Sequence, residues 1–186
     1  MGATTVQALA IAASLLLPLA AWAECSQSFD IAADEIAGLP HQQTERFAQA
    51  GMGVQFRYFL PNGERNLSYI RFDMGYPLVD DALAEAVLGQ VRQNIKTVAN
   101  LNGVTLEGPA TLEPYAAGPV NFTNDIFLGH KDDRVVVEFL GIGHDRNCLH
   151  EVRFTTVVLP EVGALDHARA LYRDVLDALA PYVVDD

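Results

Sequence analysis

The sequence predicts a single α+β domain in which an antiparallel sheet, a hairpin plus a three-stranded meander, is covered by two helices. Three observations indicate this: alternating residues around an Asn-Gly turn, two segments with apolar residues at helical spacing, and β-branched runs between them. Strands grouped by short turns, with helices between the groups, are typical of this class. The 186 residues, half of them hydrophobic, suffice for one core.

The predicted hairpin lies on either side of Asn62-Gly63. Apolar and polar residues alternate over 54–60 and again over 67–74. Asn-Gly between such runs favours a tight turn because both residues tolerate positive φ angles. Upstream, residues 26–39 are interpreted as a short strand or a loop, and residues 41–50 as a helix or an irregular lead-in.

The first clear helix is predicted to begin after Asp80, a favourable N-cap residue, and to end at Asn102-Gly103. Its apolar residues recur at helical spacing and predict a core-facing stripe. These residues are Leu83, Val87, Leu88, Val91, Ile95 and Val98.

The rest of the chain predicts strands and a final helix. Residues 104–115 contain a short strand and a proline-interrupted connector, and residues 120–159 form the three-stranded antiparallel meander. A second amphipathic helix covers residues 165–179 and stops before Pro181. The pattern does not decide whether the two helices cover one face of the sheet or both.

This order of elements, from Val54 to Leu179, resembles that of the PsbP/Mog1-like small α/β domains found among exported bacterial proteins. The resemblance implies a binding or accessory role more than catalysis. It assigns no site residue.

Residues 1–23 have the pattern of a secretory signal peptide. An apolar stretch precedes Ala21-Trp22-Ala23, which favours cleavage after Ala23, although the first residues contain no Lys or Arg. We therefore expect a signal peptide at 1–23 and an exported domain at 24–186, periplasmic or secreted, with no stable membrane insertion after cleavage. Lipidation of Cys25 is disfavoured because Glu24 precedes it.

Cys25 and Cys148 are the only two cysteines. In an oxidising compartment the expected state of such a pair is a disulfide, here between the mature N-terminus and the meander. The alternative, a thiol metal ligand or redox group, lacks a Cys-x-x-Cys motif.

The net charge of −12 disfavours nucleic acid and anionic membranes as partners. Neither a Gly-x-Ser-x-Gly motif nor a phosphate-binding loop is present in the sequence, so no cofactor is predicted. Asp73, Glu138 and Glu151 interrupt strands; we interpret the two glutamates as cross-strand partners of Arg71 or Arg153, with Glu138 facing solvent, rather than as a catalytic pair.

The candidate metal ligands are His144, Asp145 and His150, which lie in or beside one loop of the meander. Their spacing matches no known ligand motif, and His130 is expected at the far end of the intervening strand. The favoured hypothesis is a non-enzymatic accessory domain that binds an unknown protein or small-molecule ligand. The alternatives are a metal-binding protein or metal-dependent enzyme using this loop, and a structural envelope component.

Overall fold

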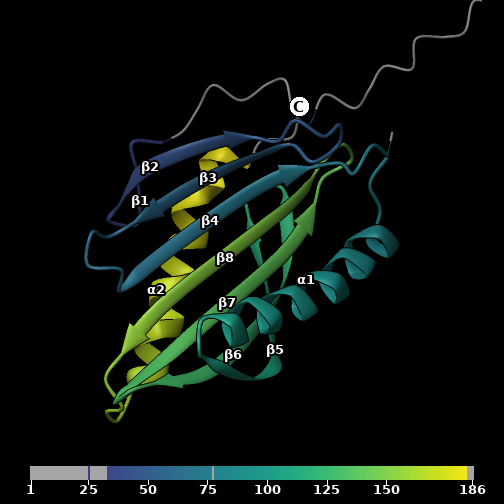
Figure 1. Ribbon diagram of the computed structural model, residues 1–186. Helices are drawn as coiled ribbons and strands as arrows, with labels where there is room; N and C mark the ends of the chain where they lie inside the picture. Colours follow the sequence, from purple (N-terminus) through teal and green to yellow (C-terminus); the bar gives the residue numbers. More distant parts are fainter. Residues whose placement is uncertain (1–24, 26–32, 77, 184–186) are drawn as a thin grey trace, which may run out of the picture.

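A computed structural model describes residues 25, 33–76 and 78–183 (Figure 1). The predicted signal peptide lies outside the described residues. Eight strands form one antiparallel sheet in the order β1-β2-β3-β4-β8-β7-β6-β5. Their bounds are β1 Glu35–Ile36, β2 Leu39–Arg46, β3 Val54–Phe59, β4 Arg65–Phe72, β5 Thr105–Ala117, β6 Val120–Lys131, β7 Arg134–His144 and β8 Leu149–Val158.

The predicted α+β class, the β3–β4 hairpin and the β6–β7–β8 meander are confirmed. The two units are joined by antiparallel pairing of β4 with β8, from Arg65↔Thr156 to Phe72↔Leu149. Strands β4 and β8 are therefore the two central strands of the sheet.

Two local predictions are wrong. Residues from His41 onward, predicted to be a helix or an irregular lead-in, instead form β2, because pairing with β3, for example His41 with Tyr58, outweighs a weak local helical preference. The predicted connector after residue 108 is part of one long edge strand, β5. Its pairing with β6 shifts register around Pro109 and Pro114, which an edge strand tolerates because proline needs no partner for a missing N–H.

The two helices, α1 (Asp81–Leu101) and α2 (Ala164–Leu179), pack on opposite faces of the sheet (Figure 1). Asp80 caps α1 as predicted, since its carboxylate accepts a hydrogen bond from the Leu83 amide at 2.9 Å. The α1 residues buried against the sheet are Val87, Leu88 and Ile95.

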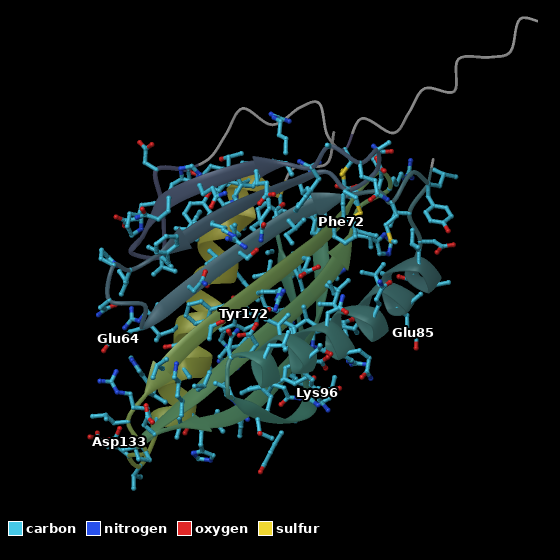
Figure 2. All side chains as sticks on the ribbon, in the orientation of Figure 1. Glu64, Phe72, Glu85, Lys96, Asp133 and Tyr172 are labelled. Carbon is cyan, nitrogen blue, oxygen red and sulfur yellow. A yellow bond between two sulfur atoms is a disulfide. The ribbon has the colours of Figure 1, made fainter. Side chains whose placement is uncertain are left out.

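Helix α2 packs on the larger core. The ring of its Tyr172, which is labelled in Figure 2, stacks on Phe139 at a centroid distance of 4.6 Å, and the Tyr172 hydroxyl donates to Asn124 Oδ1 at 2.7 Å. Gly141 makes this approach possible, because a Cβ there would lie 2.5 Å from the Tyr172 hydroxyl oxygen. The predicted apolar stripe of the final helix is confirmed.

Helix α1 covers its face of the sheet incompletely. It lies across β7, β6 and β5, so the same face of β2, β3 and β4 has no helix over it (Figure 1). Val98, predicted to face the core, is 47% exposed because it overhangs this uncovered region. The boundary between α1 and the uncovered strands is where the molecule is hollowed.

Candidate functional site

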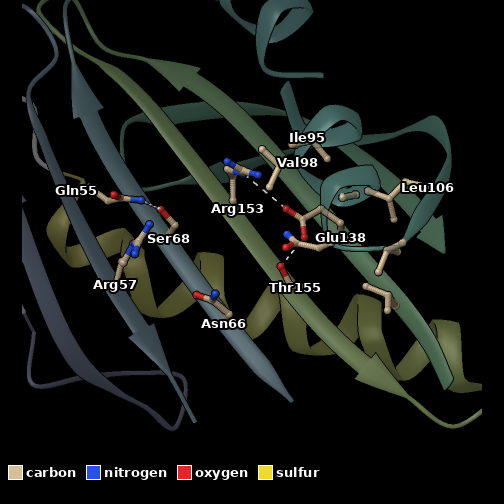
Figure 3. A pocket seen from close by; sticks show the side chains of 14 residues that line it. Gln55, Arg57, Asn66, Ser68, Ile95, Val98, Leu106, Glu138, Arg153 and Thr155 are labelled. Carbon is tan, nitrogen blue, oxygen red and sulfur yellow. Dashed lines mark hydrogen bonds and ion pairs between the residues drawn. The ribbon is translucent and has the colours of Figure 1, made fainter. Parts of the chain in front are cut away.

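A hollow of about 380 Å³ lies between the C-terminal half of α1 and strands β3, β4, β8 and β7 (Figure 3). We call it the polar lobe. One wall is apolar and comes from α1 and the start of β5, including Ile95, Val98 and Leu106. The sheet side carries hydrogen-bonding and charged groups from alternate strand positions, namely Gln55, Arg57, Asn66, Ser68, Glu138, Arg153 and Thr155.

The floor of the polar lobe contains a buried carboxylate. Glu138 is 7% exposed, and its carboxylate accepts a hydrogen bond from the Thr155 hydroxyl on β8. The Arg153 guanidinium lies 3.5 Å from the same carboxylate. The prediction that Glu138 faces solvent is wrong, because the C-terminal half of α1 and the start of β5 lie beside this position and bury it. The predicted cross-strand pairing of Glu138 with Arg153 is confirmed.

A second carboxylate shares the same arginine. Glu151 is 6% exposed and lies 3.9 Å from Arg153 Nε. Burial raises the pKa of both Glu138 and Glu151, and the nearby Glu138 charge raises that of Glu151 further, while Arg153 opposes both shifts. One guanidinium thus faces two carboxylates, an arrangement that sequence reasoning interpreted only as ordinary strand pairing.

Glu151 belongs to a neighbouring hollow of about 160 Å³, which we call the apolar lobe. Its walls come from the β2–β3 loop, the end of β4 and the first half of α1. The lining apolar residues are Phe47, Met52, Ile70, Phe72, Met74, Val87 and Val91, and the polar ones are Gln90, Asn94 and Glu151.

The two lobes are adjacent along the edge of α1. Ser68 of the polar lobe and Ile70 of the apolar lobe are two positions apart on β4, and Arg153 and Glu151 pair opposite them on β8. Residues two apart on a strand face the same side of the sheet. We call the two adjacent lobes together the α1 groove; Glu138 and Arg153 line the polar lobe, and Glu151 lines the apolar lobe beside them.

Another hollow, of about 550 Å³, lies on the opposite flank of α1 and includes His144, Asp81 and Arg92. Three of the ionisable side chains that line it, Asp81, Arg92 and His144, are already paired within the protein, and Glu85 is exposed at its rim. His144 Nε2 lies 2.9 Å from Asp81, and Arg92 contacts the fully buried Asp125 through two hydrogen bonds of 2.6 and 3.0 Å. The α1 groove is therefore the stronger candidate.

The predicted metal ligands are only partly brought together. His150 Nε2 lies 2.9 Å from Asp145 Oδ2, whereas His144 turns its Nε2 toward Asp81 on α1. His130 pairs opposite Val135, at the other end of β7 from His144, as expected. Within the described part of the chain, no three His, Cys, Asp or Glu side chains are grouped so that they could hold a metal ion.

Both ring nitrogens of His150 are engaged in the interior. Because the Asp145 carboxylate can only accept, Nε2 donates to it, and in the neutral ring Nδ1 accepts from the Tyr69 hydroxyl at 2.8 Å. Burial lowers the pKa of His150, with the Arg71 charge acting in the same direction and the Asp145 carboxylate opposing it. His150 is fully buried, so this chain of hydrogen bonds is a structural network beneath the loop.

The pKa of His144 shifts in the opposite direction, upward. Burial alone would lower its pKa, but the Asp81 carboxylate and the Asp145 carbonyl that accept its hydrogens raise the pKa overall. Burial would raise the pKa of Asp145, yet the hydrogen bonds from His150 and from the Asn147 and Cys148 amides lower it.

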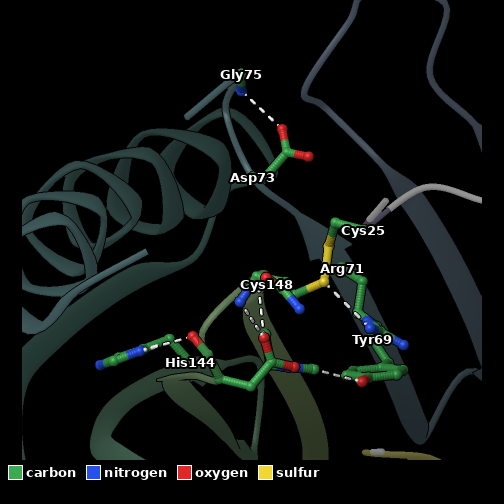
Figure 4. The surroundings of a disulfide bond; sticks show 10 residues. Cys25, Tyr69, Arg71, Asp73, Gly75, His144 and Cys148 are labelled. Atoms are coloured by element: carbon green, nitrogen blue, oxygen red, sulfur yellow. Dashed lines mark hydrogen bonds and ion pairs between the residues drawn. A yellow bond between two sulfur atoms is a disulfide. The ribbon is translucent and has the colours of Figure 1, made fainter. Parts of the chain in front are cut away.

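The predicted disulfide between Cys25 and Cys148 is present, with the two Cα atoms 5.4 Å apart (Figure 4). Both cysteines are buried, and Arg71 Nη2 lies 3.1 Å from the Cys148 sulfur. The bridge joins residue 25 to the start of β8, next to the Tyr69–His150–Asp145 network. Cys148 thus has the structural role that was predicted for it.

Comparisons with known proteins give little information. No family model and no curated protein matches this chain. One solved structure that it resembles is LpqN, involved in cell envelope biogenesis of Mycobacterium tuberculosis, with 12% identity, a TM-score of 0.32, and coverage of 75% of this chain and 78% of that one. That TM-score is too low to support a conclusion, and the resemblance to PsbP/Mog1-like domains stays a hypothesis. No helix among the described residues is long and apolar enough to cross a membrane.

Proposed function

We propose that this chain is an exported, non-enzymatic accessory domain that binds a small molecule in the α1 groove. One observation carries the proposal: α1 covers only part of its sheet face and leaves beside it a hollow with placed polar groups and one apolar wall. Small-molecule sites are typically concave, with apolar walls and a few convergent polar groups that orient the ligand. The α1 groove combines both components, on rigid strands and a helix.

Export is supported by the Cys25–Cys148 disulfide, because such bonds persist in oxidising compartments. We expect the protein recovered from an exporting host to begin at Glu24. Intact-mass measurement tests this, and a chain that retains residues 1–23 would contradict the assigned signal peptide.

Ligand binding can be tested by thermal unfolding of the oxidised protein against a panel of small polar and amphipathic compounds. A compound that raises the midpoint should lose at least about tenfold in affinity in an Arg57→Gln variant if it fills the polar lobe, since a hydrogen bond to a charged group contributes about 1.5–3 kcal/mol. Arg65→Gln is the matched control, because strand alternation places Arg65 on the opposite face of the same hairpin. Equal losses in both variants would place the ligand elsewhere.

A further inference from the structure

Glu151 is the group in the α1 groove whose surroundings leave its charge most poorly compensated. The Glu151 side chain is more than nine-tenths buried, yet no described group donates a hydrogen bond to its carboxylate, and the cation within ion-pair distance of it is Arg153, at 3.9 Å. That distance is too long for a hydrogen bond, and Arg153 lies closer to Glu138. An ionised carboxylate in an apolar site is costly unless a cation or hydrogen-bond donor reaches it.

The cavity beside Glu151 suits a small apolar body. Its volume of about 160 Å³ is comparable to that of a cavity known to hold benzene, roughly 150 Å³. Met52 and Met74 form part of the wall and are 36% and 39% exposed, so the lobe opens to solvent at the methionines. The Gly51 carbonyl accepts hydrogen bonds from the Asp73 and Met74 amides at 3.1 and 2.7 Å, which holds the two methionine-bearing segments together.

The charges also favour a cation. With both glutamates ionised, the Glu138–Arg153–Glu151 cluster carries one negative charge in excess, in a protein whose net charge is −12. Gln90 and Asn94 on α1 line the same lobe, and an amide side chain carries an oxygen that can accept hydrogen bonds. An ammonium group has three donors and no acceptor, which matches a carboxylate and two amide oxygens.

From these observations we infer that the apolar lobe is a binding site for a small organic ammonium ion, with its charged nitrogen at Glu151 and its apolar body against Met52, Phe72 and Met74. The inference rests on the proposed function of the α1 groove and specifies its ligand class. The ammonium supplies the hydrogen-bond donors and the compensating positive charge that the Glu151 carboxylate lacks within the described protein.

The experiment compares three compounds with the same ring and different charge: benzylammonium, benzyl alcohol and benzoate. The sequence contains three methionines, Met1, Met52 and Met74, and the expected signal cleavage removes Met1, so methyl-labelled methionine NMR reports on this lobe alone. We expect benzylammonium to shift both methionine signals at neutral pH and to bind at least about tenfold more tightly than benzyl alcohol. Benzoate should not bind.

Glu151→Gln should remove the preference for benzylammonium over benzyl alcohol and leave the fold intact. Glu107→Gln, at an exposed position on β5 outside both lobes, should leave the preference unchanged. If benzyl alcohol or benzoate shifts the same signals as strongly as benzylammonium, the groove binds ligands but the assigned charge class is wrong. If none of the three compounds shifts either methionine, the site assignment is wrong, and the compound panel with Arg57→Gln then decides separately whether the groove binds ligands at all.

Discussion

Breaking the Cys25–Cys148 bond should destabilise the protein strongly, because the bond closes a very long loop. The two residues are 123 positions apart. In the chain-entropy model, a loop of this length lowers the entropy of the unfolded chain enough to stabilise the fold by about 5 kcal/mol at 25 °C. With a urea dependence of about 2 kcal/mol per molar for a domain of this size, the unfolding midpoint should fall by about 2.5 M.

The cleanest variant is Cys25→Ala, since it keeps the Cys148 sulfur that Arg71 contacts. Urea unfolding followed by tyrosine fluorescence and circular dichroism, with and without reductant, measures the difference, since the only tryptophan, Trp22, is lost with the expected signal peptide. Reductant should destabilise the wild-type protein to about the level of Cys25→Ala and should leave the variant unchanged. A loss below about 1 kcal/mol, or a mass showing two free thiols in the oxidised protein, would refute the reasoning.

Three further predictions concern buried ionisable groups. Arg92→Ala should lower the free energy of unfolding, measured in urea, by about 3–5 kcal/mol, because it leaves the fully buried Asp125 without its ion-pair partner. Adding Asp125→Asn to the same chain should restore part of the loss. Lys96→Ala on the same helix is the control. Glu151→Gln should stabilise the protein at neutral pH, because the pKa of Glu151 is raised above 4.5 in the fold. The contribution of Glu151 to the stability is therefore fully favourable below pH 4.5 and is lost as the pH rises through the folded pKa. Each tenfold difference in proton affinity between the folded and unfolded chain is worth about 1.4 kcal/mol. A variant that is less stable than wild type at neutral pH, or a difference independent of pH, would contradict this. The pKa of His150 is lowered below 6.5 in the fold, so the contribution of His150 to the stability is complete above pH 6.5 and is lost as the pH falls through the folded pKa. In unfolding measured at several pH values, the stability difference between wild type and His150→Gln should shrink over that range. A constant difference would argue against a buried neutral imidazole.

The candidate site was hidden at the level of sequence because each of its residues satisfies an ordinary local rule. Glu138 lies between Val137 and Phe139, and Glu151 and Arg153 alternate with Val152, as solvent-facing residues of a half-covered sheet do. Only the position of α1 shows that these residues lie at the edge of a helix, where burial is nearly complete but the sheet beside it is open. A signal was present in retrospect: three charged residues at positions 138, 151 and 153 fall on two strands that are otherwise rich in apolar residues.

In the histidine-rich loop the sequence suggested a site that the described part of the fold does not assemble. Its composition drew attention to His144, Asp145 and His150 as possible ligands, but composition cannot specify where side chains point. In the fold, His144 faces the first turn of α1 and His150 faces Tyr69 in the interior. His144 of β7 pairs with Leu149 of β8, one position before His150, so strand alternation turns the two imidazoles to opposite faces of the sheet.

What the sequence determined by itself were the features that depend on neighbours along the chain. Asn62-Gly63 favours a tight turn wherever it occurs between alternating runs, Asp80 caps the helix that follows it, and the cysteine pair implied its own bond. The tertiary structure decided everything that depends on which distant segments meet. The pairing of β4 with β8, the placement of α1 and α2 on opposite faces, and the groove along α1 all arise from contacts between residues far apart in sequence, whose energies no local pattern contains.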